Sequence, residues 1–571
     1  DSIRTGVAGG LDERATQTVH QRIATALIEL DVTRDDLLAY HLQRGGQATD
    51  AAPYVLRAAA QAARTLAFDR SVVLYRRALE LGQAHDERGV DVRERLADAL
   101  TSAGRYAEAA RAYLELAQGA PTERALTLRE RAADRFLRSG RLAEGREVIS
   151  AVLREVGLRL PEGAARTLLS AAWSRLRLRL RGFRFRARDP AGIPTATLRR
   201  IDVAFSVGEG LAPLDVLWGV DFQTRSLLWA LAAGDPLRIA RSMGVEAATL
   251  ATFGRSSVEV HRRLVQRALA IAPGNPEVEA ICLTAQVVAA FHGNRWADGV
   301  TSAREALARF EVLGEGKHWE RMVAGMFGLA SAWWLGDLIG FRERVRERVI
   351  DARARGELLV ELHYTNAMLF PPGLIDGDAE GADAHILDVQ GRWRQPMVGM
   401  PDFYALLSRM NVALYRGRGH DALALFGAAA AGLRRLGLHR LPMLHLTLLE
   451  AEARARLAAW VEGADPAQSR ALVAARVKRI RRLPVPWGEA VVPALESQVA
   501  RLTGDAATAR AANERAVAVY ERLQMPVFAL SLRAAREDAA ERGAALDALR
   551  ARGAADAEAY ARMLTPVVGI R

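Results

Sequence analysis

A recurring pattern of small, aromatic and glycine residues constrains the fold of this chain more than any other feature. Small residues recur at Ala59, Ala97 and Ala133, 38 and 36 residues apart, and each is followed by a turn and a second apolar stretch. Small side chains let two helices cross closely, an aromatic ring fills the remaining gap, and glycine permits a sharp turn. Each unit is therefore predicted to be a pair of antiparallel helices that stacks on the next pair.

The spacing within these units is that of a tetratricopeptide repeat. The clearest copy has Leu96, Ala97, Leu100, Gly104, Tyr106, Ala109, Tyr113 and Pro121; the copy before it has Ala58, Ala59, Ala62, Phe68, Tyr75 and Ala78; and the copy after it has Ala132, Ala133, Phe136, Gly140, Leu142, Ile149 and Val152, with Gly145 where alanine is usual. Looser copies of the turn at 293–296, 336–338, 417–419 and 504–506 are each followed by helical spacing. The pattern predicts an all-α fold, a tetratricopeptide-like α-solenoid that forms a right-handed superhelix of helix-turn-helix repeats.

Local composition divides the chain into four predicted parts. Residues 1–13, with three glycines before helical patterning begins, are expected to be the disordered start of a fragment; 14–160 to be N-terminal tetratricopeptide-like repeats; 161–200 a basic helix and linker; and 201–571 C-terminal degenerate helical repeats. The segment 208–235 contains Pro213, Trp218 and Trp229, and it is predicted to be a re-packed junction between two halves of the solenoid.

Charge and cysteine content favour a soluble cytoplasmic protein. Lys plus Arg total 79 and Asp plus Glu 67, which gives a net charge of +12, and all basic residues except Lys317 and Lys478 are arginine. This modest excess is typical of solvated helix faces encoded by a GC-rich genome. We find no signal peptide and no uninterrupted apolar run that could span a bilayer, so no membrane partner is expected. The lone Cys282 lies in an apolar run and is predicted to be a buried structural thiol.

One basic segment breaks the repeat pattern. Its arginines are Arg175, Arg177, Arg179, Arg181, Arg184, Arg186 and Arg188. Strict alternation resembles a strand, but the surrounding leucines favour one helix that ends near Gly182 and is followed by a linker. With Trp173, Phe183 and Phe185, the arginines could bind phosphates or stack on bases. The alternative, which we favour, is a brace between domains in which they cover carboxylates of neighbouring helices.

The motifs that carry catalysis or cofactor binding are missing from the sequence. Asp221-Phe222-Gln223 and His261-Arg262-Arg263 lack the residues that complete the kinase motifs they resemble. The segment 314–318 lacks both the first glycine and the final hydroxyl of a phosphate-binding loop. His41, His292 and His363 stand alone beside apolar residues and are interpreted as packing or capping histidines. We therefore predict no catalytic residue, no metal site and no cofactor.

Several stretches resemble the C-terminal half of large bacterial serine/threonine protein kinases that carry an AAA-type ATPase module followed by a tetratricopeptide-like region. The resembling stretches are 39–47, 67–70, 74–81, 178–186, 219–225 and 233–241. In that family the kinase and nucleotide-binding motifs lie upstream of such a segment. The resemblance implies that the parent protein is a kinase or ATPase, and that the repeats sense a partner or ligand and regulate the upstream modules.

The leading functional hypothesis is a non-catalytic regulatory scaffold that binds a protein partner, the upstream kinase or ATPase modules, or a ligand in its solenoid groove. The alternative is a nucleic-acid-associated regulator that binds through the arginine-rich segment 175–188, although nucleic acid is the less favoured partner. A hidden enzyme, such as a nucleotide hydrolase, would require a polar pocket that no motif announces. The sequence leaves the oligomeric state open.

Overall fold

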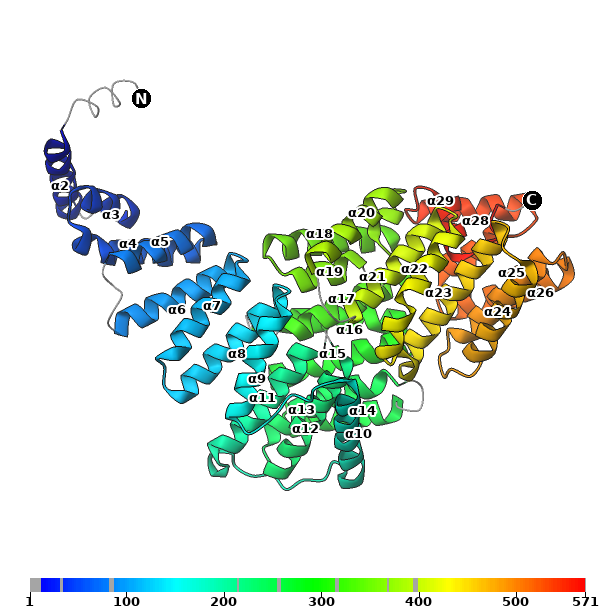
Figure 1. Ribbon diagram of the computed structural model, residues 1–571, viewed down its shortest axis with the longest axis horizontal. Helices are drawn as coiled ribbons and strands as arrows, with labels where there is room; N and C mark the ends of the chain where they lie inside the picture. Colours follow the sequence, from blue (N-terminus) through cyan, green and yellow to red (C-terminus); the bar gives the residue numbers. More distant parts are fainter. Residues whose placement is uncertain are drawn as a thin grey trace. The chain divides into compact units, whose positions relative to one another are not determined.

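The computed structural model describes residues 12–30, 34–81, 87–212, 215–253, 258–313, 318–366, 369–393 and 399–569. Within these ranges the regular structure consists of helices joined by short turns, and no strand is present (Figure 1). The predicted all-α fold is confirmed, and the arrangement of successive helix-turn-helix pairs is that of an α-solenoid. Contacts divide the chain into an N-terminal unit, residues 1–152 with 352–357, and a C-terminal unit, residues 153–351 with 358–571.

In the N-terminal unit the helices form a row, and each helix from α2 to α7 packs on the next one. Its helices are α2 (Glu13–Glu29), α3 (Asp35–Arg44), α4 (Ala48–Arg64), α5 (Phe68–Glu80), α6 (Glu87–Ser102), α7 (Tyr106–Gln118), α8 (Thr122–Arg138) and most of α9 (Leu142–Glu155). The predicted small residues Ala59, Ala97 and Ala132 are completely buried where the paired helices cross. A Cβ atom on Gly145 would lie 2.7 Å from Cδ2 of Leu137, which explains why glycine replaces alanine in that repeat.

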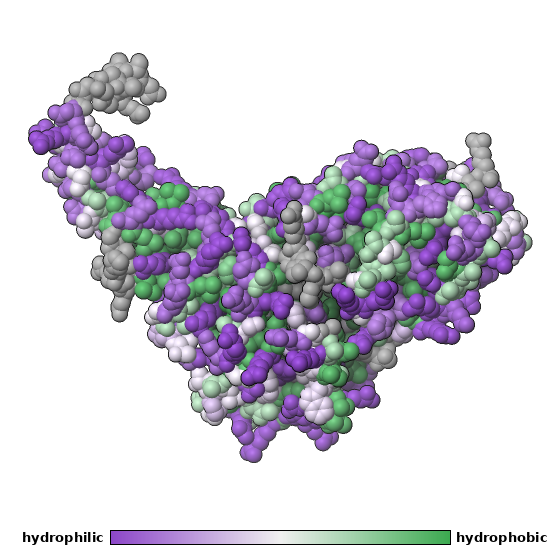
Figure 2. All heavy atoms as spheres, viewed as in Figure 1, coloured by the Kyte–Doolittle hydropathy of each residue, from purple (hydrophilic) through white to green (hydrophobic). Residues whose placement is uncertain are grey.

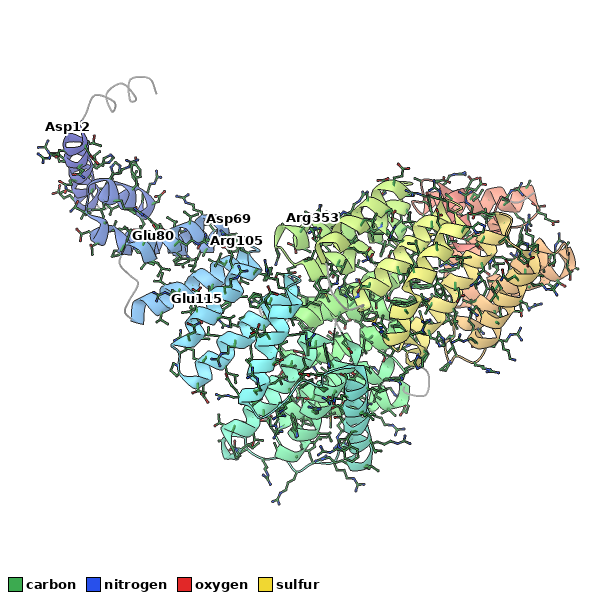
Figure 3. All side chains as sticks on the ribbon, in the orientation of Figure 1. Asp12, Asp69, Glu80, Arg105, Glu115 and Arg353 are labelled. Atoms are coloured by element: carbon green, nitrogen blue, oxygen red, sulfur yellow. The ribbon has the colours of Figure 1, made fainter. Side chains whose placement is uncertain are left out.

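Polar contacts between successive repeats of this unit join residues that are 34 positions apart. Arg70 donates to the carboxylate of Asp36 at 3.1 Å, and Arg77 donates to the side-chain oxygen of Gln43 at 2.8 Å. This spacing equals the length of a tetratricopeptide unit. Other acidic side chains of the unit, including Asp69, Glu80 and Glu115, are exposed (Figure 3).

The C-terminal unit stacks its helix pairs in two layers. Its helices are α10 (Ala164–Arg181), α11 (Thr195–Leu211), α12 (Val216–Ala233), α13 (Pro236–Ala251), α14 (Val258–Ile271), α15 (Pro276–His292), α16 (Trp296–Leu313), α17 (His318–Trp334), most of α18 (Leu338–Ala354), α19 (Leu358–Asn366), α20 (Ala379–Trp393), α21 (Met400–Tyr415), α22 (Gly419–Arg435), α23 (Pro442–Val461), α24 (Pro466–Ile480), α25 (Gly488–Leu502), α26 (Ala506–Arg522), α27 (Pro526–Ala534), α28 (Ala539–Ala551) and α29 (Ala557–Leu564), with single 3-10 turns at Pro190–Gly192, Pro372–Leu374 and Leu438–Arg440.

The inner layer consists of the odd-numbered helices from α13 to α25, each of which contacts the next odd-numbered helix, whereas α16, α20, α22, α24 and α26 pack on the outside. The two layers differ in burial. In α21, 14 of 16 residues are buried, whereas α22 buries only 3 of 17. A helix that is apolar on all sides requires neighbours on all sides, and the inner layer supplies them.

Aromatic residues fill the inner side of the solenoid between α15–α17 and α25–α29. Trp334 stacks on Phe528 with ring centroids 5.2 Å apart and nearly parallel planes. The side-chain oxygen of Asn294 accepts a hydrogen bond from the backbone of Trp487 at 2.8 Å. The early and late repeats of the C-terminal unit therefore contact each other, and packed side chains occupy the space where an open groove would lie.

Candidate functional site

An apolar cavity of about 250 Å³ lies among the inner helices of the C-terminal unit. Its walls come from α11, α12, α13, α15, α17, α19 and α21 and from the region where α23 begins. Side chains such as Val245, Ala248, Ile281, Val288 and Phe327 supply most of the surface. The volume is close to the lower end of the range for small-molecule sites, which are mostly apolar with a few placed polar groups.

Three helix glycines shape the wall of this cavity. A Cβ atom on Gly244 would lie 2.7 Å from Cγ2 of Ile281, so glycine is what allows α13 and α15 to approach closely. A Cβ atom on Gly208 would lie 2.9 Å from the side chain of Gln223. Gly219 similarly leaves room for Ala212. These glycines have a packing role, which is the usual reason for glycine inside a helix.

Among the uncharged side chains that line the cavity, Gln223 and His292 each have a buried polar atom with no hydrogen-bond partner among the described residues. Gln223 donates from its amide nitrogen to the carbonyl of Phe205 at 3.1 Å, but its oxygen accepts no bond. Nδ1 of His292 also has no partner, and burial lowers the pKa of this histidine to about 4. His292 is therefore neutral near pH 7. An unpaired buried polar atom costs about 1–3 kcal/mol. The Gln223 oxygen favours a ligand that supplies a donor, whereas His292 Nδ1 donates or accepts according to the tautomer of the ring.

His363 and Tyr404 also line the cavity, and they belong to later helices, α19 and α21. Nδ1 of His363 donates to the carbonyl of Leu359 at 2.8 Å, which leaves Nε2 as an acceptor in the neutral ring. Burial lowers the pKa of His363 and raises the pKa of Tyr404. Both side chains are thus uncharged near neutral pH, and their rings lie 6.1 Å apart.

Other polar side chains of the lining are already engaged. The hydroxyls of Thr249 and Thr284 donate to carbonyls of their own helices at 3.0 and 2.9 Å. The carboxylates Glu209 and Glu320 also line the cavity, and both make interactions within the chain, although Oε1 of each accepts no hydrogen bond from the described residues. The described residues contain no group of three metal-ligating side chains. The arrangement can hold a small, mainly apolar and uncharged molecule that carries at least one hydrogen-bond donor.

The arginines predicted as an anionic contact do not converge on this cavity. As predicted, α10, which carries the first four of these arginines, ends at Arg181, and Gly182 adopts a positive φ of 66° at its end. Arg175 bonds both carboxylate oxygens of Glu246 at 2.7 and 2.5 Å, and Arg181 donates to the carbonyl of Leu231 at 2.9 Å. Arg175 thus covers a carboxylate of a neighbouring helix, whereas Arg181 binds a backbone carbonyl, and both contacts lie within the C-terminal unit. The remaining arginines of the set are exposed: Arg177, Arg179, Arg184, Arg186 and Arg188.

The resembling stretch 219–225 has a structural role in the C-terminal unit. Asp221 is completely buried and accepts hydrogen bonds from the hydroxyls of Ser170 and Ser174, each at 2.7 Å. Arg225 forms an ion pair with the same carboxylate at 2.9 Å. Asp221 therefore clamps α10 to α12.

The structure also places the other residues singled out in the sequence. His41 lies 2.8 Å from His20 between their Nδ1 atoms, and Nδ1 of His261 lies 3.0 Å from the carbonyl of Ala247. Cys282 is buried, as predicted, and burial raises the pKa of its thiol to about 12. Residues 314–317, most of the incomplete phosphate-binding loop, and Pro213 lie outside the described residues, as do residues 1–11.

Sequence reasoning did not find the cavity. It named His292 and His363 only as packing residues, and no motif groups them with Gln223. The available signals were weak: glycines inside helices at Gly208 and Gly244, and isolated polar residues within apolar runs.

No family model and no curated protein matches the chain. Among solved structures, a monomeric mutant of IFIT1 with Gppp-AAAA matches at 12% sequence identity, covers 84% of this chain and 90% of its own, and gives a TM-score of 0.26. The fold assignment therefore rests on the helix pairs of the structure itself. Among its described residues, no helix combines the length and apolar character needed to cross a bilayer.

Proposed function

We propose that this chain is a non-catalytic regulatory scaffold whose C-terminal unit senses a small, uncharged, mainly apolar ligand in its cavity. The observation that supports this most directly is the presence of two unpaired polar atoms, the acceptor Gln223 Oε1 and the ring nitrogen Nδ1 of His292, on residues that line an apolar cavity. A ligand with an N–H or O–H group would satisfy them, and its apolar part would cover the surrounding side chains.

The cavity is suited to regulation because its walls come from repeats that are far apart in the sequence, from Gly208 to Leu444. A ligand bound there contacts helices of several repeats at once and stabilises only their stacked arrangement. Its binding energy would shift the equilibrium between closed and loosened forms of the C-terminal unit. A partner that contacts either form could detect this shift.

The finer part of the proposal concerns context. The resembling stretches support a role as the regulatory region of a cytoplasmic bacterial serine/threonine kinase with an AAA-type ATPase module, and the output would be control of those modules or of a separate protein partner. In one of these stretches, 219–225, the role of Asp221 is structural, because its carboxylate accepts hydrogen bonds from Ser170 and Ser174 of α10. Phosphorylation or nucleotide hydrolysis by the parent protein, with and without ligand, would test this context.

A fluorescence titration tests the cavity. The probe is N-phenyl-1-naphthylamine, which is uncharged, apolar and carries one N–H donor. The chain should give a saturable increase in emission, and Ala248→Leu and Val323→Phe, which fill the cavity, should abolish it. Ala428→Leu, on the exposed side of α22, is the matched control and should bind as the unmodified chain does. Saturable binding that survives both filling substitutions would contradict the assignment.

Gln223→Leu and His292→Phe separate polar recognition from apolar burial. Each keeps a side chain of similar size but removes an unpaired polar atom, so each should weaken binding of the probe by about five- to tenfold, as expected for the loss of one net hydrogen bond. Unchanged affinity in both variants would show that the cavity binds by apolar contact alone.

A further inference from the structure

Helix α10 carries a row of large apolar side chains on its solvent-facing side. The row consists of Leu169, Trp173, Leu176 and Leu180, with exposed fractions of 69%, 61%, 46% and 78%. Their spacing of four, three and four residues places them on one face of the helix. In Figure 2 the surface around the position of α10 shows hydrophobic residues beside hydrophilic ones. A continuous row of this kind marks an interaction surface rather than scattered exposure.

The charge around this row has one sign. Residues 163–188 contain no Asp or Glu. Arg166 and Arg177 lie on one side of the row and Arg179 on the other, as the helical period requires. All three are exposed, and none has a partner among the described residues. The face is therefore complementary to an anionic surface that also offers apolar contact.

A hollow of about 470 Å³ adjoins the row at Trp173. Arg159, Arg166, Arg177, Arg200 and Arg225 line it together with Trp229. Asp221 compensates the charge of Arg225 at 2.9 Å, but Arg200 stacks on Trp229 with its guanidinium carbon 4.4 Å from the ring centre. The Nε–H group of Arg200 is buried and donates to no partner among the described residues. The hollow thus retains an excess of positive charge and one buried N–H that lacks an acceptor.

We propose that this face of α10 binds the surface of a membrane that contains anionic phospholipid. The leucines and Trp173 enter the region between headgroups and acyl chains, and the hollow takes the phosphate of a headgroup through Arg166, Arg177 and Arg200. A basic amphipathic helix with Trp and Leu on its other face is characteristic of helices that lie in the membrane interface. Such a helix lies in the membrane surface and does not cross the bilayer. The proposal is therefore compatible with the absence of a membrane-spanning helix among the described residues.

Two other macromolecules could use arginines, but they fit the face less well. A nucleic acid would use the charge and Trp173, yet it leaves three exposed leucines in water. An acidic protein helix could cover the row, but it would leave the arginine-lined hollow beside the row unfilled. A phospholipid offers a phosphate and an apolar surface next to each other, in the same order as the hollow and the row.

Co-sedimentation of the full chain with vesicles tests the proposal. The chain should co-sediment with vesicles of phosphatidylcholine and phosphatidylglycerol, and it should stay in the supernatant with vesicles of phosphatidylcholine alone. Binding should weaken as salt is raised, because exposed charges are screened. Arg177→Gln and Arg179→Gln should each weaken binding about fivefold, as expected for roughly 1 kcal/mol per basic residue near an anionic membrane. Arg470→Gln and Arg515→Gln, which are exposed on α24 and α26, are the matched controls and should have no effect.

Apolar insertion is tested by Leu176→Ser and Leu180→Ser against Val312→Ser, which is 83% exposed on α16. Only the first two should reduce vesicle binding, and circular dichroism should show all variants equally helical because these side chains are exposed. Equal binding to neutral vesicles, or no binding by the folded chain, would overturn the proposal. Competition by glycerol 3-phosphate or by a single-stranded oligonucleotide as effective as that by anionic vesicles would overturn it too, in favour of a free-anion or nucleic-acid site.

Discussion

The indole nitrogen of Trp333 donates a hydrogen bond to the hydroxyl of Tyr560 across 2.9 Å, although the two residues are 227 positions apart in the chain. Both are completely buried, and Trp333 also stacks on Phe370. The bond ties α17 to α29, so it belongs to the contact between early and late repeats of the C-terminal unit. Loss of this hydrogen bond should therefore lower the stability of the whole C-terminal unit.

Tyr560→Phe should lower the free energy of unfolding of the C-terminal unit by about 1–3 kcal/mol, because it leaves the buried indole N–H without an acceptor. Trp333→Ala should cost more, about 3–5 kcal/mol, since it also opens a cavity. Urea denaturation followed by tryptophan fluorescence and circular dichroism measures both. Tyr40→Phe, on the exposed side of α3, should change nothing. Equal small effects for all three variants would mean that the contact contributes little.

Acid should destabilise the C-terminal unit through His292. Burial depresses the pKa of this histidine from 6.5 to about 4, so the unfolded chain takes up a proton at higher pH than the folded one. Its contribution to stability is therefore complete above pH 6.5 and is lost as pH falls from about 6.5 to about 4, with a total loss of about 3 kcal/mol.

Urea midpoints measured across this range should fall less steeply for His292→Gln than for the unmodified chain. The exposed His439→Gln should follow the unmodified chain. His363, whose pKa burial also lowers, will contribute a remaining slope in every variant. Equal pH dependence of the urea midpoint in His292→Gln and the unmodified chain would show that His292 has the same pKa in the folded and the unfolded state.

Replacement of Asp221 should release α10. Asp221→Ala removes the acceptor for Ser170, Ser174 and Arg225, and breaking such a buried ion pair costs about 3–5 kcal/mol. We expect faster amide hydrogen exchange across α10, measured by mass spectrometry, with the N-terminal unit unchanged. Asp298→Ala, at an exposed ion pair with Arg295, is the control and should leave α10 protected. Unaltered exchange in α10 after the loss of Asp221 would mean that other contacts hold the helix.

Leu66 is predicted to be a stabilising site for glycine. It has a positive φ of 60° in the turn between α4 and α5, where the next two repeat turns have Gly104 and Gly140 at 75° and 78°. A left-handed conformation costs an L-residue about 1–2 kcal/mol, and the exposed Leu66 has little packing to lose. Leu66→Gly should raise the thermal midpoint of the N-terminal unit, whereas Gly104→Leu should lower it. A decrease for Leu66→Gly would indicate that chain entropy outweighs the strain.

The sequence predicted the repeats because their geometry depends on local residues. Ala59, Ala97 and Ala132 must be small where helices cross, and a glycine must occupy a turn with positive φ, so both leave a periodic trace in the sequence. The end of α10 at Gly182 was predictable for the same reason. The turn residues Leu66, Gly104 and Gly140 have positive φ and lie 38 and 36 residues apart, so the structure has the repeat spacing that the sequence pattern indicates.

The cavity could not be predicted, since it depends on the packing of helices that are distant in the chain. Gln223, His292 and His363 come from three different repeats and share no spacing. Which polar atoms of Gln223 and His363 remain for a ligand depends on the backbone carbonyls that their other side-chain atoms bond. The packing of the inner layer determines these bonds. The same holds for the filled inner side of the solenoid, because an open or a closed superhelix has the same pattern within each repeat.

The contact between Asn294 and Trp487 limits how the number of repeats in the C-terminal unit can vary. In the N-terminal row a terminal helix pair has one neighbour, so its loss or duplication leaves the other pairs as they were. In the C-terminal unit, removal of a middle pair such as α21 with α22 would shift the late repeats by one step and separate Trp334 from Phe528. The number of helix pairs is therefore fixed in the C-terminal unit and can change in the N-terminal unit. Natural relatives should differ in the length of the N-terminal row.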